Sequence, residues 1–222
     1  MKKISRKLID QIESEAKGFF TEKNDGCHDW SHVQRVTKIA MHIGKIEKAD
    51  LFVLEISAIL HDISREHEIM SKGKSCHAIA GSKLAVDLLA KYKIDSEIIQ
   101  RISRCIVTHR NRTIHKPQTI EEKILFDADK LDAIGAVGIG RVFMFAGITS
   151  GLLCTGNEKT LAKNGNDLSF TKDDTAPLEY EKKLKFVKDK MLTKEGKRMA
   201  RERHEFMKTF FERFWKEVEG KI

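Results

Sequence analysis

Proline is nearly absent from this chain, and its scarcity limits the fold more than any other feature of the sequence. Only two prolines, Pro117 and Pro177, occur in 222 residues, of which 7% are aromatic. Folds built from many short strands and turns usually contain more prolines at their turns, whereas long helices exclude proline from their interiors. No segment alternates apolar and polar residues as a half-buried strand does. The sequence therefore predicts an all-α fold, a single bundle of about eight to ten helices.

Apolar periodicity locates the predicted helices. The most apolar segment, residues 51–60, follows Asp50 and contains neither glycine nor proline. Its length favours a helix buried on most sides. Periodic apolar residues predict further helices over residues 3–20, 76–92, 95–109, from 119 onward, 178–191 and 193–218. Residues 67–75 and 150–177 are polar and contain glycine, so we expect them to be irregular.

One more helix is predicted ahead of the apolar segment. Asp29 or Ser31 could cap its first turn, and Ser31 with Gln34 three residues later fits a capping box. Gly44 is expected to mark its end.

The helices are expected to form one domain over residues 1–222. Only about 45 residues follow the irregular stretch, too few for a separate core. We expect a metal-binding core at about residues 25–145, with helices in residues 178–219 packing on it. The last helix carries an apolar stripe, which favours such packing over a dimer interface or a membrane surface.

Composition narrows the cellular setting and the partners. No apolar run approaches the ~20 residues that cross a bilayer, and the first residues are too acidic for a signal peptide, so we expect a cytoplasmic protein without a membrane partner. The four cysteines form no C-x-x-C pair, which indicates reduced thiols. The net charge of +8 fits either an anionic ligand or solvated lysines on helix faces.

Histidines and aspartates gather at the ends of the predicted helices. Eight of the nine histidines lie between His28 and His115. Imidazole and carboxylate without thiolate suit a divalent transition ion or magnesium, because closed structural zinc sites usually recruit cysteine. The best-supported pair is His61 with Asp62, whose side chains can converge on one ion at a helix end.

The order of these motifs resembles the HD-domain superfamily of metal-dependent phosphohydrolases, whose pattern is H…HD…D across several helices. Within it the chain is most similar to the small stand-alone bacterial HD hydrolases. The resemblance covers nearly the whole chain and rests on the segments HDWSHVQRV, ILHDISRE, CHAIAGSKLA, IVTHR, ILFDADKLDAIGAVGIGR and ARERHEFMKTFFERF.

The resemblance implies a ligand set for a divalent ion, which could be Mn, Mg, Co, Ni, Fe or Zn. Carried over residue by residue, the ligands are His32, His61, Asp62 and Asp129. Asp127 or Asp132 could replace Asp129, although such neighbours more often orient ligand histidines.

The resemblance also implies roles for His77 and His109, since equivalent histidines in related enzymes hold a second metal or contact phosphate. Either could protonate a leaving oxygen near neutral pH. Relatives place a water-positioning acid three to five residues after the HD pair, where this chain has Glu66. His28 precedes its helix, which favours a role in substrate binding or in orienting a ligand.

Cationic residues beside these motifs are candidates for binding phosphate. Arg65, Lys130 and Arg141 could each contact phosphate oxygens, since guanidinium pairs bidentately and ammonium supplies a compact charge. Each could instead form an ordinary ion pair, Arg141 above all because it lies outside the metal motifs.

Together these features predict a metal-dependent phosphohydrolase that uses a metal-activated water on a small phosphorylated substrate, with a nucleotide as the leading candidate. Cleavage of a nucleoside triphosphate to monophosphate and pyrophosphate is favoured by resemblance alone. The alternatives are a nucleotide monophosphatase, a cyclic phosphodiesterase, a di-iron oxygenase of the same fold, or a non-catalytic nucleic-acid-binding module. Aromatic RNA-binding motifs are absent from the sequence, so nucleic acid is not the expected partner; a homodimer stays open.

Overall fold

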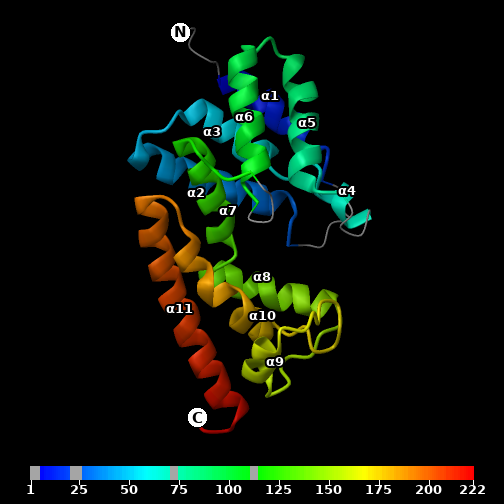
Figure 1. Ribbon diagram of the computed structural model, residues 1–222, viewed down its shortest axis with the longest axis vertical. Coiled ribbons are helices and arrows are strands. Elements are labelled where there is room, and N and C mark those ends of the chain that lie inside the picture. The colour runs from blue at the N-terminus through cyan, green and yellow to red at the C-terminus, as the bar shows by residue number, and fades with distance from the viewer. Residues whose placement is uncertain (1–5, 21–26, 71–74, 111–114) are drawn as a thin grey trace. The chain divides into compact units, whose positions relative to one another are not determined.

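The structure is a computed structural model that describes residues 6–20, 27–70, 75–110 and 115–222 (Figure 1). Within these residues every regular element is a helix, and none is a strand. The predicted all-α fold is therefore confirmed. Part of the predicted helix at residues 3–20 lies outside the described residues.

The chain divides into two compact units, and each is described by itself. Unit 1 holds residues up to 20, then residues 28–129 and Leu192–Glu195; unit 2 holds Cys27, Lys130–Met191 and Gly196–Ile222. That the C-terminal helices pack on a metal-binding core within one domain stays a prediction.

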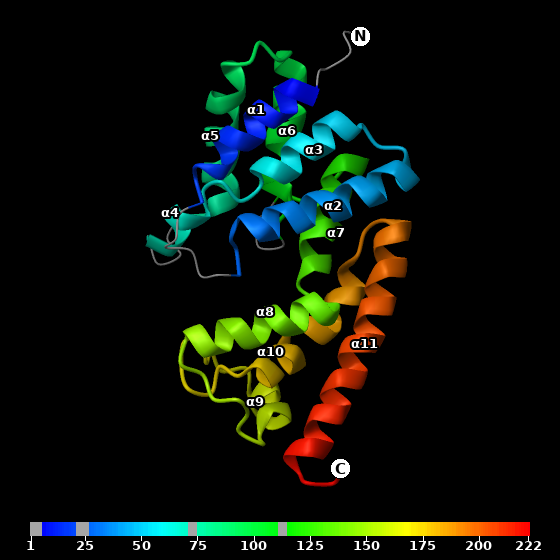
Figure 2. The same cartoon turned by 180° about the vertical axis from the view of Figure 1, so that it is seen from behind.

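The helices of unit 1 form its apolar core. They are α1 (Arg6–Lys17), α2 (Trp30–Glu47), α3 (Leu51–Leu60), α4 (Arg65–Met70), α5 (His77–Ala90), α6 (Ser96–Thr108) and α7 (Ile120–Asp132), whose last three residues are counted with unit 2. Helices α5 and α6 lie side by side, and α3 packs against both α2 and α6 (Figure 2). Buried apolar residues such as Leu54, Leu60 and Ile106 hold these helices together, because removing their side chains from water is favourable.

Local sequence explains where the second and third helices begin. The carboxylate of Asp29 accepts a hydrogen bond from the His32 amide, and that of Asp50 accepts from Phe52 and Val53. The predicted start of a helix after Asp50 is confirmed, and so is Asp29 as a predicted cap of α2. The predicted capping box of Ser31 is wrong, because its hydroxyl donates to Asp29 Oδ1 at 2.7 Å.

Gly44 does not end helix α2, which continues to Glu47 and closes on Lys48 with φ of 58°. A Cβ at Gly44 would lie 2.5 Å from a methyl group of Leu54. The glycine therefore serves the close packing of α2 on α3 rather than a helix end.

Unit 2 contains α8 (Gly135–Ile148), α9 (Glu158–Asn164), α10 (Ala176–Lys182), the 3-10 helix η1 (Leu184–Lys190) and most of α11 (Lys194–Val218). The short α9 lies in a stretch predicted to be irregular, and the predicted helix 178–191 is divided at Lys183. The stripe on α11 buries Met207 and Phe211, and Phe211 stacks on Tyr180 with ring centroids 4.3 Å apart. These aromatic contacts hold unit 2 together.

Among the described residues, no single helix has the length and apolar content to cross a membrane. Helices α7 and α8 meet that test only as a pair bent by 63°.

Candidate functional site

Helix ends in unit 1 bring the predicted ligand histidines together. His61 and His109 are the residues on which α3 and α6 end, His77 is the first residue of α5, and His32 lies in the first turn of α2. All four are buried, with exposed fractions of 4% or less. Polar rings at the ends of apolar helices thus converge where backbone groups are no longer committed to helical hydrogen bonds.

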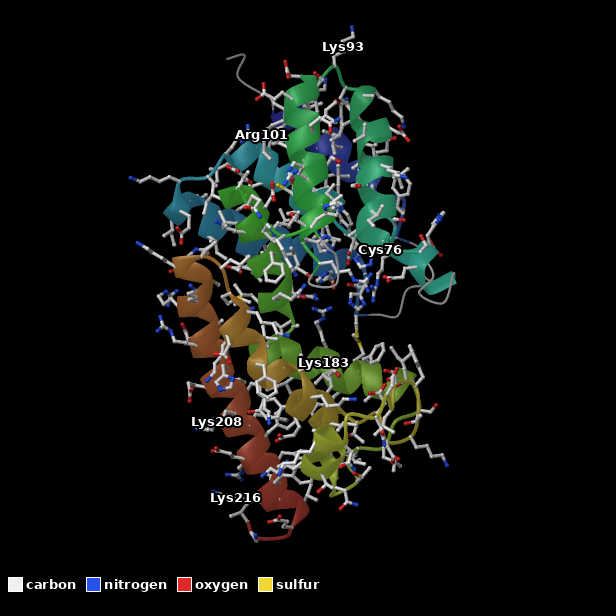
Figure 3. All side chains as sticks on the ribbon, viewed as in Figure 1. Cys76, Lys93, Arg101, Lys183, Lys208 and Lys216 are labelled. Carbon is white, nitrogen blue, oxygen red and sulfur yellow. The ribbon has the colours of Figure 1, made fainter. Side chains whose placement is uncertain are left out.

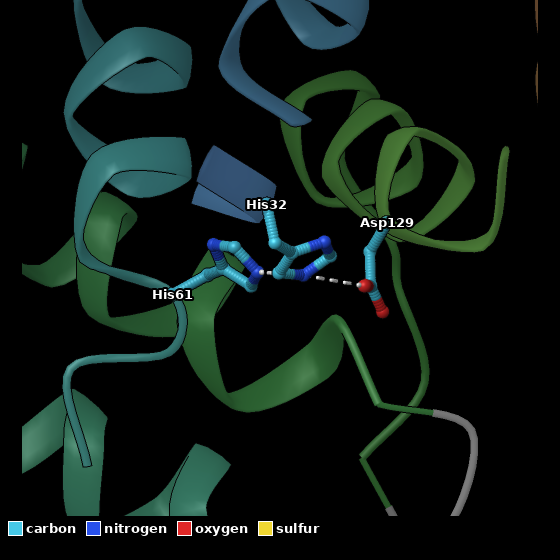
Figure 4. Close-up of side chains that lie close together, drawn as sticks. All are labelled: His32, His61 and Asp129. Carbon is cyan, nitrogen blue, oxygen red and sulfur yellow. Dashed lines mark hydrogen bonds and ion pairs between the residues drawn. The ribbon is translucent and has the colours of Figure 1, made fainter. Parts of the chain in front are cut away.

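Three of these side chains form the first donor group: His32, His61 and Asp129 (Figure 4). The Nε2 atoms of His32 and His61 are 3.3 Å apart, and His32 Nε2 lies 3.5 Å from Asp129 Oδ1. Both histidines are fully buried, whereas the Asp129 side chain is 19% exposed. The group is therefore closed on the histidine side and reaches solvent at its carboxylate.

The second donor group consists of Asp62, His77 and His109. The two histidine Nε2 atoms are 3.2 Å apart. Asp62 Oδ1 lies 3.2 Å from His77 Nε2 and 3.6 Å from His109 Nε2. All three residues are buried.

Asp62 links the two donor groups, because its carboxylate oxygens face opposite ways. While Oδ1 faces the second group, Oδ2 lies 3.6 Å from His61 Nε2 and 3.7 Å from His32 Nε2. Only 4% of its side chain is exposed. A carboxylate in this position can serve two ions at once.

The hydrogen bonds of two histidines indicate which ring atoms are available to an ion. His61 Nδ1 donates to the Ala58 carbonyl at 2.8 Å, and His109 Nδ1 donates to the Ile106 carbonyl at 2.6 Å. In the neutral ring the proton on Nδ1 leaves a lone pair on Nε2. The Nε2 lone pair of His61 faces His32 and Asp62, and that of His109 faces His77 and Asp62, so possible ligand atoms converge on the Asp62 carboxylate.

Such a convergence of acceptors fits a bound cation. Donors about 2.1 Å from one ion lie roughly 3 to 3.5 Å from each other, and the distances here, 3.2 to 3.7 Å, are close to that range. Nitrogen and carboxylate donors without thiolate suit Mn, Fe, Co, Ni, Zn or Mg ions. The residues present therefore fit the predicted divalent ion.

Burial and charge give the histidines opposite protonation tendencies. Burial lowers the pKa of His61 to about 4, although Asp62 opposes this. Burial also acts to lower the pKa of His77, but Asp62 and Glu68 outweigh it and raise the pKa. Burial acts to raise the pKa of Asp62, yet His61 and His77 hold it well below its usual range. Asp62 therefore stays ionised, as a ligand must be.

The structure separates the three aspartates of the motif DADKLD. Both oxygens of Asp127 accept hydrogen bonds from the backbone amides of Leu192 and Thr193, each at 2.8 Å. Asp132 Oδ2 accepts from Arg141 Nη1 at 2.7 Å. Asp129 is the member that joins a donor group, so the geometry favours it over its neighbours as the ligand.

Two predicted phosphate-binding residues belong to unit 2. Arg141 pairs with the buried Asp132 and donates through Nη2 to the Cys27 carbonyl at 2.8 Å, which binds both Nη atoms to the protein. Lys130 follows Asp129 on α7 and is half-buried. Their contact with substrate stays a prediction.

The remaining predicted residues lie in unit 1. His28 precedes α2, as predicted, and its ring meets that of His32 edge-on with centroids 5.6 Å apart. Glu66 is half-buried on α4, and its catalytic role stays a prediction. Arg65 Nη1 donates to Glu68 Oε2 at 2.8 Å.

Sequence reasoning missed Glu68 and Arg110. Glu68 is buried and accepts hydrogen bonds from His77 Nδ1, from Arg65, and from Arg110 Nη1 at 2.5 Å. Burial acts to raise the pKa of Glu68, but the hydrogen bonds from His77 and Arg110 lower it. The i, i+3 spacing of Arg65 and Glu68 was an available signal, had residues 67–75 been expected to continue as a helix.

The chain is similar to known proteins over the segment that carries both donor groups. The model of the HD domain family matches residues 29–134, which contain both donor groups. Over 218 residues the chain is 34% identical to the uncharacterized protein YpgQ of Bacillus subtilis, covering 96% of this chain and 95% of that protein.

The chain is also similar to solved structures over nearly its whole length. The crystal structure of Bacillus subtilis YpgQ in complex with ADP has a TM-score of 0.72 and 30% identity, covering 96% of this chain and 98% of that one. A predicted HD superfamily hydrolase from an uncultured Thermotogales bacterium has a TM-score of 0.65 and 30% identity, covering 96% of this chain and 92% of that one.

Proposed function

The chain belongs to the HD-domain superfamily of hydrolases, and we propose that within it this protein is a metal-dependent nucleotide phosphohydrolase. The observation that carries the proposal is the buried pair of donor groups joined by Asp62. Buried acceptors that face one another cost free energy unless a cation satisfies them. Such a site in a hydrolase family is suited to activating water.

In the proposed enzyme, each donor group would hold one ion. His32, His61 and Asp129 would hold one ion, and His77 with His109 would hold a second, with Asp62 between them. Bound divalent ions lower the pKa of a coordinated water and neutralise charge on phosphoryl oxygens. The exposed edge at Asp129 offers a way in for a phosphate group.

Of the two roles that the resemblance implies for His77 and His109, the geometry favours ligation. His109 directs Nε2 toward Asp62 with Nδ1 bonded to its own helix, an arrangement that suits an ion better than proton transfer. Protonation of the leaving oxygen is then left to a water or to a residue outside this group.

A nucleotide substrate is supported by two observations. The related YpgQ was crystallised with ADP. The chain also carries a net charge of +8, which favours anionic ligands. We propose a nucleoside triphosphate as the substrate, cut to monophosphate and pyrophosphate.

A metal-supplemented substrate panel tests the proposal. The purified chain, stripped of metal and reloaded with Mn²⁺, Mg²⁺, Co²⁺ or Ni²⁺, is incubated with nucleoside mono-, di- and triphosphates and with cyclic nucleotides. Products are separated so that phosphate and pyrophosphate are distinguished. We expect pyrophosphate and monophosphate from triphosphates. Release of phosphate from monophosphates would instead identify a monophosphatase. Hydrolysis of cyclic nucleotides would identify a phosphodiesterase.

The second donor group supports one further candidate. An HD-type di-iron oxygenase needs two metal positions with extra histidine ligands, which Asp62, His77 and His109 provide. An iron-loaded sample that consumes oxygen with a polyol, together with no hydrolysis anywhere on the nucleotide panel, would favour that activity instead.

A further inference from the structure

His77 faces an orientation problem that two of its partners do not share. His61 and His109 end their helices, so each ring reaches back to the carbonyl three residues earlier, Ala58 or Ile106. Carbonyls of the last helical turn lack helical partners and are available for such bonds. His77 instead begins α5, where no helical turn precedes it. A side chain from elsewhere has to accept its Nδ1 proton.

Glu68 supplies that acceptor from α4, which packs against α5. Its Oε2 atom accepts from His77 Nδ1 and also from Arg65 Nη1 at 2.8 Å. The two nitrogens lie 3.2 Å apart and both donate to the same oxygen, so they form no bond with each other. The proton on Nδ1 leaves the lone pair of His77 on Nε2, which faces Asp62 Oδ1 at 3.2 Å.

The Glu68 carboxylate is itself held in place. Arg110 Nη1 donates to its other oxygen, Oε1, at 2.5 Å, and Arg65 lies in the same helix three residues earlier. The side chains of Glu68, Arg65 and Arg110 are 11%, 20% and 17% exposed, so solvent screens these contacts only in part. Cys76 stands at the start of α5 beside this cluster, with its thiol 3.7 Å from Arg110 Nη1 (Figure 3).

We propose that Glu68 is a positioning residue that assembles the second donor group by directing Nε2 of His77 toward it. Glu68 does not itself touch the ion; Arg65 and Arg110 hold its carboxylate at the ring. The inference rests on the proposed metal centre and goes beyond it, because it makes the second ion depend on α4 while the first does not.

Manganese binding tests this dependence directly. Metal-free parent, Glu68→Ala and Glu68→Gln are titrated with Mn²⁺, and the free and bound ion are measured by electron paramagnetic resonance. Loss of a residue that orients a ligand histidine weakens metal affinity by about 10- to 100-fold. We expect that loss at the second ion in Glu68→Ala, with the first ion's affinity unchanged. Glu68→Gln keeps an acceptor for the Nδ1 proton, so we expect it to recover part of the loss.

A matched control is Asp87→Asn. Asp87 is an exposed carboxylate on α5, the helix that begins with His77. Its replacement removes the same charge without touching Glu68, so both ions should bind as in the parent. A merely structural role for Glu68 would weaken both ions together or neither.

The outcomes separate this inference from the proposed function. A parent that binds no Mn²⁺ overturns the metal centre and with it the function. A parent that binds two ions, beside a Glu68→Ala protein that binds both equally well, overturns only the role of Glu68, as does a parent that binds a single ion at saturation. If Glu68→Ala fails to fold, Glu68→Gln decides alone: unchanged affinity for the second ion rejects the proposal.

Discussion

The two donor groups differ in what holds them. His32 and His61 of the first group have no exposed surface and stand at the ends of α2 and α3, which pack against each other. In the second group, His77 begins its helix and depends on a side chain from the six-residue helix α4. A histidine at the end of a helix can thus be oriented by a carbonyl of its own last turn, as His61 and His109 are. His77, at the start of a helix, needs a side chain from another segment.

The same difference appears in the pKa values. His61 is buried with Nδ1 bonded to a carbonyl, and its pKa falls to about 4. His77 is bonded to Glu68 and faces Asp62, and these carboxylates raise its pKa despite burial. In the absence of metal, burial thus favours the neutral form of His61, whereas the neighbouring carboxylates favour the protonated form of His77.

The largest effect is expected from the loss of Asp62, the residue that the two donor groups share. Asp62→Ala should abolish both metal binding and turnover, because its carboxylate faces each group. Metal charge is worth several kcal/mol to the transition state, so activity should fall by about 1,000-fold or more. Elemental analysis and the nucleotide assay measure the two losses. A variant with full metal content and activity would remove Asp62 from the centre.

Variants with a single histidine replaced should show that the two donor groups bind separate ions. His61→Ala is expected to lose the first ion and His109→Ala the second, each retaining the other ion in an Mn²⁺ titration. We expect activity to fall by about 100-fold in each, because one of two charges is lost. If either variant lost both ions together, the groups would be one cooperative site.

The pH dependence of stability should reflect His61. Its pKa is about 4 in the folded chain, against an ordinary value of 6.5 for a histidine exposed to water, so its contribution is complete above pH 6.5. As pH falls toward 4, the unfolded state takes up a proton that the folded state resists, which costs up to about 3 kcal/mol. The raised pKa of His77 acts the other way, stabilising below pH 6.5 and losing this as pH rises through its folded value.

Chemical denaturation of metal-free parent and His61→Gln across this range measures the effect. Between pH 6.5 and 4, the free energy of unfolding of the parent should fall by about 3 kcal/mol more than that of the variant. Parallel curves would show that His61 does not titrate as its burial implies.

The smallest expected effect concerns substrate alone. Lys130→Ala should raise KM about tenfold through the loss of one charged hydrogen bond to phosphate, with metal content unchanged. Steady-state kinetics and elemental analysis check both halves. Equal kinetic constants for variant and parent would assign Lys130 to the solvated surface.

Much of unit 1 follows from local sequence. Asp50 and Asp95 cap the helices that they were predicted to begin, and α3 ends at the predicted HD pair. The short helices α4 and α9 were not predicted, since few residues carry too little periodicity to show a helix, and their stability comes from packing. Glu68 was missed for that reason.

The sequence by itself determined the all-α class and placed His32, His61 and Asp62 at helix ends. Only the tertiary structure decided which aspartate of DADKLD joins them. Asp127 is bound to the backbone of residues 192–193, and Asp132 to Arg141. The partners of Asp127 lie 65 and 66 residues farther along the chain, so the spacing within DADKLD does not indicate them. The physical reason is that a buried carboxylate takes whichever donors the packed chain brings to it, so its role depends on segments distant in sequence.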